Sequence, residues 1–326
     1  MRAASQREVG DAARVWARPE FWIFAVLALA PLAAKLGAEA YLLSLATHAL
    51  IFAIAALSLD FVLGHGALVS FGHAAFLGIG AYAVAMLSRW GHEEIFVQLL
   101  AAISAAAVFA LATGAISLRA GGVYYIMSTL AFGQMLYFFF VSLSAWGGDD
   151  GVTLDARSRL FGAAVLKSDV GLYYFALAVL MACWALAERI VGSRFGRVLG
   201  AIRQNPLRVR AVGFQPFGYR LTAYAISGAM CATAGVLLAN QSEFVSPAFM
   251  TWQRSGELLV MVILGGVGSL WGAILGAIAF LALEEMLSSL TEQGNLILGP
   301  LLVLIALTGP TGLAGFVMRS AGGGAR

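Results

Sequence analysis

Charge, cysteine and histidine are all scarce in this chain. Only 11% of its 326 residues are charged, and it has 2 cysteines and 4 histidines. Cys183 and Cys231 lie in apolar runs with no Cys, His or Asp near enough in sequence to complete a ligand set. We therefore expect neither a disulfide framework nor a metal site. The sequence also has no G-x-x-x-x-G-K-[ST] loop, so we do not expect it to bind ATP in the P-loop manner.

Long apolar runs take the place of the missing charge. Hydrophobic residues make up 61% of the chain, and its mean hydropathy is +0.87. Because a bilayer offers the backbone no hydrogen-bond partners, runs of roughly 20 apolar residues predict membrane-spanning helices. The predicted fold is an all-α polytopic membrane protein with about ten transmembrane helices, or eight to ten where re-entrant half-helices replace full crossings. The ten candidates lie near 20–37, 41–63, 71–90, 95–118, 121–145, 170–190, 219–240, 256–267, 270–289 and 294–315.

Arginine placement predicts the topology. Seven arginines and no Asp or Glu fall within one short segment: Arg189, Arg194, Arg197, Arg203, Arg208, Arg210 and Arg220. The positive-inside rule places this segment, the N-terminal arm 1–20 and the tail 319–326 in the cytoplasm, which even numbers of crossings allow. The net charge of +3 then marks one membrane face and not a nucleic-acid surface. Residues 21–318 form a single transmembrane domain in this prediction, with the first hydrophobic segment retained and not cleaved as a signal peptide.

Many of the 38 glycines lie inside apolar runs. Such glycines allow close helix packing, and beside Ser and His they also predict discontinuous helices around a transport route. The sequence GGVGS at 265–269 predicts either a hairpin between two spans or the end of a re-entrant half-helix. Gly268, Gly272 and Gly276 recur at intervals of four, as on one helix face. The candidates for a helix break or pathway are Gly64, Ser70, Gly72, His73, Phe76, Gly78, Gly80, Tyr82, Gly265, Gly266, Gly268, Gly272 and Gly276.

Ser70 and His73 carry the useful chemistry of the glycine-rich segment 64–87. An intramembrane hydrolase is one alternative, but a spacing of three residues is no evidence that a nucleophile and its base meet in space. We expect instead that Ser70 caps the following helix and that His73 bonds a backbone group in its first turn.

Four acidic residues fall within or beside the predicted spans. Asp60 is expected near the inner end of its span, Glu257 at the start of the eighth, and Glu284 and Glu285 near the outer end of the ninth. None is expected at mid-span, where an ionisable group costs roughly 2.5–3.5 kcal/mol on insertion scales and is usually functional. A stand-alone carrier driven by protons or sodium is therefore the less favoured alternative.

The arginine-rich segment also predicts two short helices. An apolar stripe at helical spacing indicates that the first is amphipathic: Phe195, Val198, Leu199 and Ile202. Asn205 suits the N-cap of the second helix, Pro206 its first position and Gly213 its C-terminal stop. Because topology alone requires neither caps nor periodicity, a docking surface is favoured over simple anchoring.

One sizeable polar loop, 146–169, is predicted on the opposite face. It contains the sequence GGDDG: Gly147, Gly148, Asp149, Asp150 and Gly151. Its mixed charge suits an external surface on which a soluble protein docks, and a plain solvated connector is the alternative.

Four stretches resemble the membrane subunits of branched-chain amino acid ABC importers, in particular the LivM type. They are LSLDFVLGHGALVSFGHAAFLGIGAYAVAML (57–87), LRAGGVYYIMSTLAFGQML with GGDDG (118–151), GRVLGAIRQNPLRVRAVGFQPFGYRLTAYAISGAMCATAGVLLA (196–239), and SPAF with SGELLVMVILGGVGSLWGAILGA (246–277). The resemblance covers about 57–310 and keeps the order of the family. Where the family usually has G-Y-A-G-Q-L-S, Ala67 and Leu68 replace a glycine and a glutamine. Related permeases carry urea, short amides or aromatic acids, so the substrate is left open.

The resemblance implies a bacterial inner-membrane permease that is not an enzyme. It would pair with a LivH-like permease, two cytoplasmic ABC ATPases and a periplasmic substrate-binding protein; the ATPases would use ATP and Mg, and this chain would hold no cofactor. Loop 146–169 would face the binding protein, and the cytoplasmic loop 191–218 would contact an ATPase. Arg197 and Arg203 are expected to transmit the coupling, within the set Gly196, Arg197, Ala201, Arg203, Asn205, Pro206 and Gly213.

Overall fold

The computed structural model describes residues 40–154 and 156–290, together with short stretches at 23–24, 26–29, 31, 299–300 and 312–315. The described part is mostly α-helical. Its helices are α3 (Ala40–Gly66), α4 (Ala74–Arg89), α5 (Ile95–Ser117), α6 (Val123–Ser142), α7 (Asp169–Gly192), α8 (Arg194–Gln204), α9 (Pro206–Ala211), α10 (Pro216–Ser242), α11 (Trp252–Gly265) and α12 (Leu270–Leu290). Single 3-10 turns lie at η1 (Ser144–Trp146), η2 (Val165–Lys167) and η3 (Pro247–Met250).

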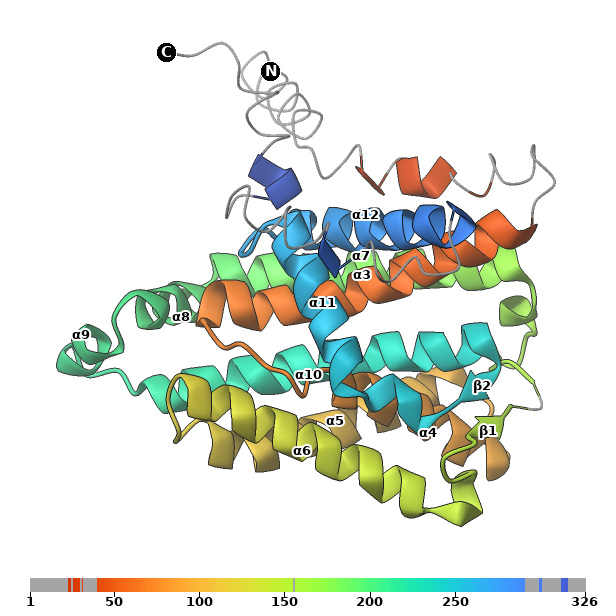
Figure 1. Cartoon of the computed structure of the whole chain (residues 1–326), viewed down its shortest axis with the longest axis horizontal. Coiled ribbons are helices and arrows are strands. Elements are labelled where there is room, and N and C mark those ends of the chain that lie inside the picture. The colour runs from red at the N-terminus through yellow and green to blue at the C-terminus, as the bar shows by residue number, and fades with distance from the viewer. Residues whose placement is uncertain are drawn as a thin grey trace, which may run out of the picture.

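Six of the described helices are long and apolar enough to cross a membrane: α3, α5, α6, α7, α10 and α12. They run side by side along the longest axis of the molecule (Figure 1). The spans predicted at 41–63, 95–118, 121–145, 170–190, 219–240 and 270–289 correspond to these helices. The count of ten is not confirmed, because the spans predicted at 20–37 and 294–315 lie largely outside the described residues, as do the N-terminal arm and the tail.

The two remaining predicted spans, 71–90 and 256–267, are shorter helices. α4 has 16 residues and α11 has 14. At a rise of 1.5 Å per residue these lengths correspond to about 24 and 21 Å, less than the roughly 30 Å of hydrocarbon that a full crossing needs. The prediction of a full span at 71–90 is therefore wrong, because residues 67–73 run back into the bundle without helical structure before α4 begins (Figure 1).

An inverted arrangement relates the two short helices. α3 and α10 each have 27 residues and run in opposite directions, and each is followed by an irregular segment, a short helix and a long helix (Figure 1). α10 packs along α4 and α5, while α3 packs along α11 and α12. The chain thus repeats one motif in opposite orientations, an organisation found in membrane transporters, where the broken helices surround the binding site.

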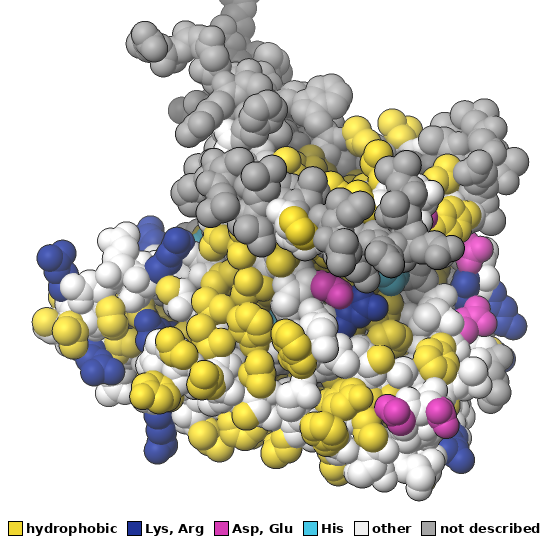
Figure 2. All heavy atoms as spheres, in the orientation of Figure 1, with side chains coloured by type: hydrophobic (Ala, Val, Ile, Leu, Met, Phe, Trp, Pro, Cys, Tyr) yellow, Lys and Arg dark blue, Asp and Glu magenta, His cyan; other side chains and the backbone are white. Residues whose placement is uncertain are grey.

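The two ends of the bundle differ in charge. Basic side chains gather over α8 and α9, which form what we call the arginine-rich end (Figure 2). At the other end, β1 (Val152–Thr153) pairs antiparallel with β2 (Phe244–Val245), and acidic side chains stand among a few basic ones there. We call this the strand end. The small pairing, which the sequence did not predict, joins loop 146–169 to the end of α10.

Candidate functional site

The first turns of α4 and α11 meet inside the bundle. The backbone amide of Ala74, the first residue of α4, donates a hydrogen bond to the hydroxyl oxygen of Ser255 in α11, over 3.0 Å. Ser255 is buried and supplies the cap that His73, at the N-cap position of α4, does not. The prediction that Ser70 caps this helix is wrong, because the cap comes from a residue 181 positions away.

A second polar contact at this junction joins Ser58 of α3 to His73. Ser58 Oγ donates to the carbonyl oxygen of Ala55 over 2.7 Å and lies 2.9 Å from His73 Nε2. The hydroxyl group and the imidazole share one hydrogen bond, whose direction depends on the tautomer of His73. The prediction that the His73 ring bonds a backbone group is therefore wrong, because its partner is the Ser58 side chain. The Nε2 atom of His73 pairs with Ser58 and not with Ser70, so the structure does not join the serine and histidine of the hydrolase alternative.

Glycines bring α4 into close contact with its neighbours. A Cβ atom on Gly80 would lie 2.1 Å from the carbonyl oxygen of Ala232 in α10, and one on Gly72 would lie 2.1 Å from that of Thr129 in α6. A Cβ atom on Gly78 would collide with the side chain of Met250 in η3. Close packing therefore accounts for these three glycines, as it does elsewhere in membrane bundles.

Phe76 and Tyr82, the other two candidates on α4, belong to the core. Phe76 is fully buried and meets Tyr224 edge to face at 5.5 Å between ring centroids. Tyr82 stacks on Phe140 with centroids 4.0 Å apart. Neither side chain lines an open route in this conformation.

The turn between α11 and α12 has the glycine geometry that the sequence indicated. Gly266 and Gly268 have φ angles of +108° and +87°, which other residues rarely adopt. Gly272 and Gly276 lie on α12 and pack against Gly265 and the backbone of α11. The expected helix face through Gly268, Gly272 and Gly276 is wrong for Gly268, because this residue lies in the turn and not on the helix.

This turn is linked to both α3 and α8. The amide of Gly268 donates to Asp60 Oδ1 over 2.7 Å, and a Cβ atom on Gly64 would lie 2.4 Å from the Cα atom of Gly268. Arg203 of α8 donates a hydrogen bond from Nη1 to the carbonyl oxygen of Gly64. A hydrogen bond therefore joins the arginine-rich end to α3 at the site where α3 contacts the turn between α11 and α12.

The two short helices of the arginine-rich end form as predicted. Asn205 Oδ1 accepts hydrogen bonds from the amides of Leu207 and Arg208 over 3.0 and 3.1 Å, and Pro206 is the first residue of α9. Gly213 follows α9 with a φ of +94°. On α8, the stripe residues Leu199 and Ile202 are fully buried. Both caps and the amphipathic pattern are thus confirmed.

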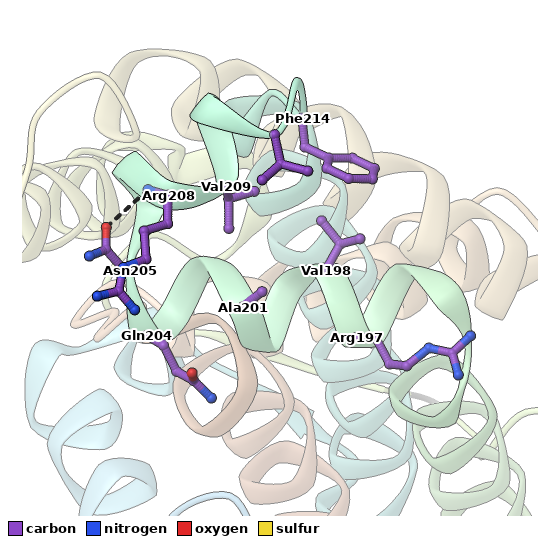
Figure 3. Close-up of a pocket in the computed structure, with 9 residues that line it drawn as sticks. Arg197, Val198, Ala201, Gln204, Asn205, Arg208, Val209 and Phe214 are labelled. Atoms are coloured by element: carbon purple, nitrogen blue, oxygen red, sulfur yellow. Dashed lines mark hydrogen bonds between the residues drawn. The ribbon is translucent and has the colours of Figure 1, made fainter.

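A pocket of about 600 Å³ lies between α8 and α9 (Figure 3). Val198 on α8 faces Val209 and Phe214 across it, while Arg197 and Gln204 extend away from these apolar side chains. Ala201, Asn205, Arg208 and Val212 complete the lining. The predicted coupling residues thus divide: Arg197, Ala201 and Asn205 line the pocket, Arg203 contacts α3, and Gly196 packs on the end of α7.

Hydrogen bonds and an ion pair fix loop 146–169 at the strand end. Gly147, Gly148 and Gly151 have positive φ angles and form the turn that exposes Asp149 and Asp150. The amide of Ser158 donates to Asn240 Oδ1 over 2.7 Å, and Arg157 pairs with Asp169 at 2.7 Å. The loop therefore presents a fixed surface.

Sequence reasoning missed the roles of Ser58 and Ser255. Both are polar residues in apolar helices, which is the signal that could have singled them out. Their partners lie 15 and 181 positions away, and only the fold brings them together.

Paired short helices in an inverted arrangement and six helices able to span a bilayer define a multi-pass membrane transport protein. Residues 41–306 match the family described as "branched-chain amino acid transport system / permease component". The chain belongs to this family.

Its relatives are permease proteins of high-affinity branched-chain amino acid transport systems. The chain is 30% identical to LivM of Salmonella typhimurium over 82% of its own length and 69% of the relative, and equally similar to LivM of Escherichia coli. It is 26% identical to LivH of Escherichia coli, over 73% of both chains. No solved structure matches the chain significantly.

Proposed function

We propose that this chain is one half of the membrane channel of an ATP-driven importer for branched-chain amino acids or a similar small polar solute. A LivH-like permease forms the other half, which the similarity to both LivM and LivH supports. Two cytoplasmic ABC ATPases supply the energy and use ATP and Mg, and a periplasmic binding protein delivers the solute to the outer loop. The arginine-rich end, with both termini, faces the cytoplasm of a bacterial inner membrane.

The hydrogen bond from Arg203 to Gly64 carries this proposal. An ATPase bound in the pocket between α8 and α9 can move α8. The hydrogen bond from Arg203 transmits this movement to the last turn of α3. Because Gly64 touches Gly268, the same movement reaches α11, whose first turn caps α4. ATP-driven closure of the ATPases thereby shifts the paired half-helices and opens the route inward, as alternating access requires.

Proteoliposomes provide the test. The chain is reconstituted with two ABC ATPases, a LivH-like permease and a binding protein from the same organism, and the uptake of radiolabelled leucine is measured with ATP, without ATP, and with a non-hydrolysable ATP analogue. We expect uptake only with hydrolysable ATP. Uptake by this chain alone, without ATP, would contradict the proposal and favour a stand-alone carrier. ATP-driven uptake of urea or an amide in place of leucine would change the substrate but keep the mechanism.

A further inference from the structure

Arg254 and Glu257 form an ion pair on a partly exposed face of α11, close to the point where this helix meets α4. Arg254 Nη1 lies 2.8 Å from Glu257 Oε2, and the two side chains remain 40% and 33% exposed. Figure 2 shows acidic, basic and histidine atoms near one another between the two ends of the molecule, among hydrophobic atoms. Glu257 had been expected at the edge of the membrane, but α11 begins inside the bundle.

Contacts with α3 fix the depth of this pair. The guanidinium carbon of Arg254 lies 5.9 Å from the centroid of the Phe52 ring, and Phe52 is the thirteenth of the 27 residues of α3. Its neighbour Ser255 caps α4 within the bundle. Arg254 and Glu257 are thus exposed at the middle of the membrane-spanning layer, where charged side chains face water-filled cavities or pair inside the protein and do not face lipid.

Further polar groups surround the pair. His48 Nδ1 lies 3.2 Å from Gln241 Oε1, and the His48 ring lies against that of Phe52, with centroids 4.7 Å apart. Glu284 on α12 lies close enough for the charges of Arg254, Glu257 and Glu285 to act on its carboxyl group. The cluster therefore places one guanidinium among several carboxyl groups, beside the ring of Phe52.

Gly256 leaves space beside the pair. A Cβ atom on this residue would meet no atom of the described residues within 4 Å, although glycine is unfavourable inside a helix. Packing therefore does not explain this glycine, in contrast to Gly72 or Gly80. A small residue here keeps the face of α11 open to a ligand.

From this arrangement we propose that Arg254 and Glu257 form a mid-membrane binding site for a zwitterionic amino acid, with Arg254 binding the carboxylate and Glu257 the ammonium group. A guanidinium 2.8 Å from the carboxylate would repel a metal cation, and Glu257 and Glu284 would repel a simple anion. A ligand that carries both charges complements both partners and replaces their mutual pairing. The inference rests on the proposed transport function and specifies the chemical class of its substrate.

Uptake of radiolabelled leucine by the full importer in proteoliposomes tests the site. Loss of a charged hydrogen bond should lower the rate about tenfold or more in Arg254→Gln and in Glu257→Gln. Gly256→Leu should act likewise by filling the open face, whereas Gly256→Ala should keep the wild-type rate. Arg119→Gln is the matched control, because it removes an exposed arginine elsewhere, and it should transport normally. Wild-type uptake by Arg254→Gln and Glu257→Gln would overturn the site while leaving the importer function intact.

Two further measurements separate ligand binding from a structural ion pair. The double variant Arg254→Glu/Glu257→Arg preserves the pair, so restored uptake would show a purely structural role. The second measurement is copurification of the second permease with each single variant. We expect normal amounts; a variant that no longer copurifies with the second permease would assign the ion pair to the subunit interface instead.

Direct binding distinguishes failure of the site from failure of the transport proposal. The purified chain in lipid nanodiscs is titrated with radiolabelled leucine, in competition with leucinamide, which lacks the carboxylate, and 4-methylpentanoate, which lacks the ammonium group. We expect leucine to bind and each analogue to compete at least about tenfold less well. If leucine binds and Arg254→Gln abolishes binding, the site stands even where ATP-driven uptake is absent. No leucine binding by the wild-type chain would overturn it.

Discussion

Arg203 donates a hydrogen bond from its guanidinium group to the carbonyl oxygen of Gly64, and it thereby ties α8 to the last turn of α3. Gly64 in turn lies against Gly268, whose amide is held by Asp60. Helix α8 of the arginine-rich end is thus connected by two contacts to the turn that ends α11. This connection makes the coupling hypothesis testable at single residues.

Arg203→Glu should uncouple transport from ATP hydrolysis. The substitution removes the donor and places a carboxylate beside the Gly64 carbonyl and close to Asp60. Because hydrogen bonds to charged groups contribute about 1.5–3 kcal/mol, we expect ATP-driven leucine uptake to fall about tenfold or more, with unchanged membrane insertion. Uptake and ATPase activity of the reconstituted importer are the measurements.

Two variants control for that result. Arg203→Lys keeps a charged donor and should retain part of the uptake, whereas Arg119→Glu changes an exposed arginine on the turn after α5 and should leave uptake unchanged. Normal uptake by a correctly inserted Arg203→Glu protein would contradict the coupling role.

Filling the pocket between α8 and α9 should weaken attachment of the ATPases. Ala201 is exposed and lines this pocket, so the indole of Ala201→Trp occupies the space without disturbing the buried core. We expect less ATPase to copurify with the permease in detergent. Leu207→Trp is the matched control, because Leu207 is 72% exposed on α9 and lies outside the pocket lining. Equal recovery of the ATPase with both variants would rule out this pocket as the docking surface.

The arginine-rich end shows how much local sequence can predict. Its two helices follow from the apolar stripe, from Asn205 as a cap and from Pro206, all within about 20 residues. Such signals act between near neighbours in the chain, and the structure reproduces them. The six long spans were predictable for a similar reason, since length and hydropathy are local properties.

The interior of the bundle could not be predicted in this way. The segment at 71–90 is apolar enough to suggest a full crossing, but only tertiary packing shows that α4 starts at Ala74 inside the bundle. The cap from Ser255 and the mid-membrane position of Glu257 depend on the same arrangement. Polar side chains in a helix were visible in the sequence, but their depth and partners follow from where the helix begins.

Gly80→Ala should destabilise the protein. The added methyl group would lie 2.1 Å from the carbonyl oxygen of Ala232, so α4 and α10 must separate, and such overpacking typically costs about 1–3 kcal/mol. Thermal unfolding of the purified chain in nanodiscs should show a lower midpoint. Gly200→Ala provides the comparison, since a Cβ atom there meets no atom within 4 Å in the described part of the chain and alanine favours the helix by about 0.8–1 kcal/mol. An equal or higher midpoint for Gly80→Ala would contradict the close approach of the two helices.

Removing the hydroxyl of Ser255 should loosen the junction of the two half-helices. Ser255→Ala leaves the Ala74 amide without its acceptor at a buried helix start, and loss of such a cap costs about 1 kcal/mol. Ser255→Thr retains the hydroxyl and should keep the wild-type unfolding midpoint. Ser104→Ala removes a hydroxyl that bonds only within α5 at an exposed position, and it should have little effect. If Ser104→Ala and Ser255→Ala lowered the midpoint equally, the contact between α4 and α11 would not be what stabilises the junction. A specific effect of Ser255→Ala would show that the broken helices depend on each other, as a coupled movement of both requires.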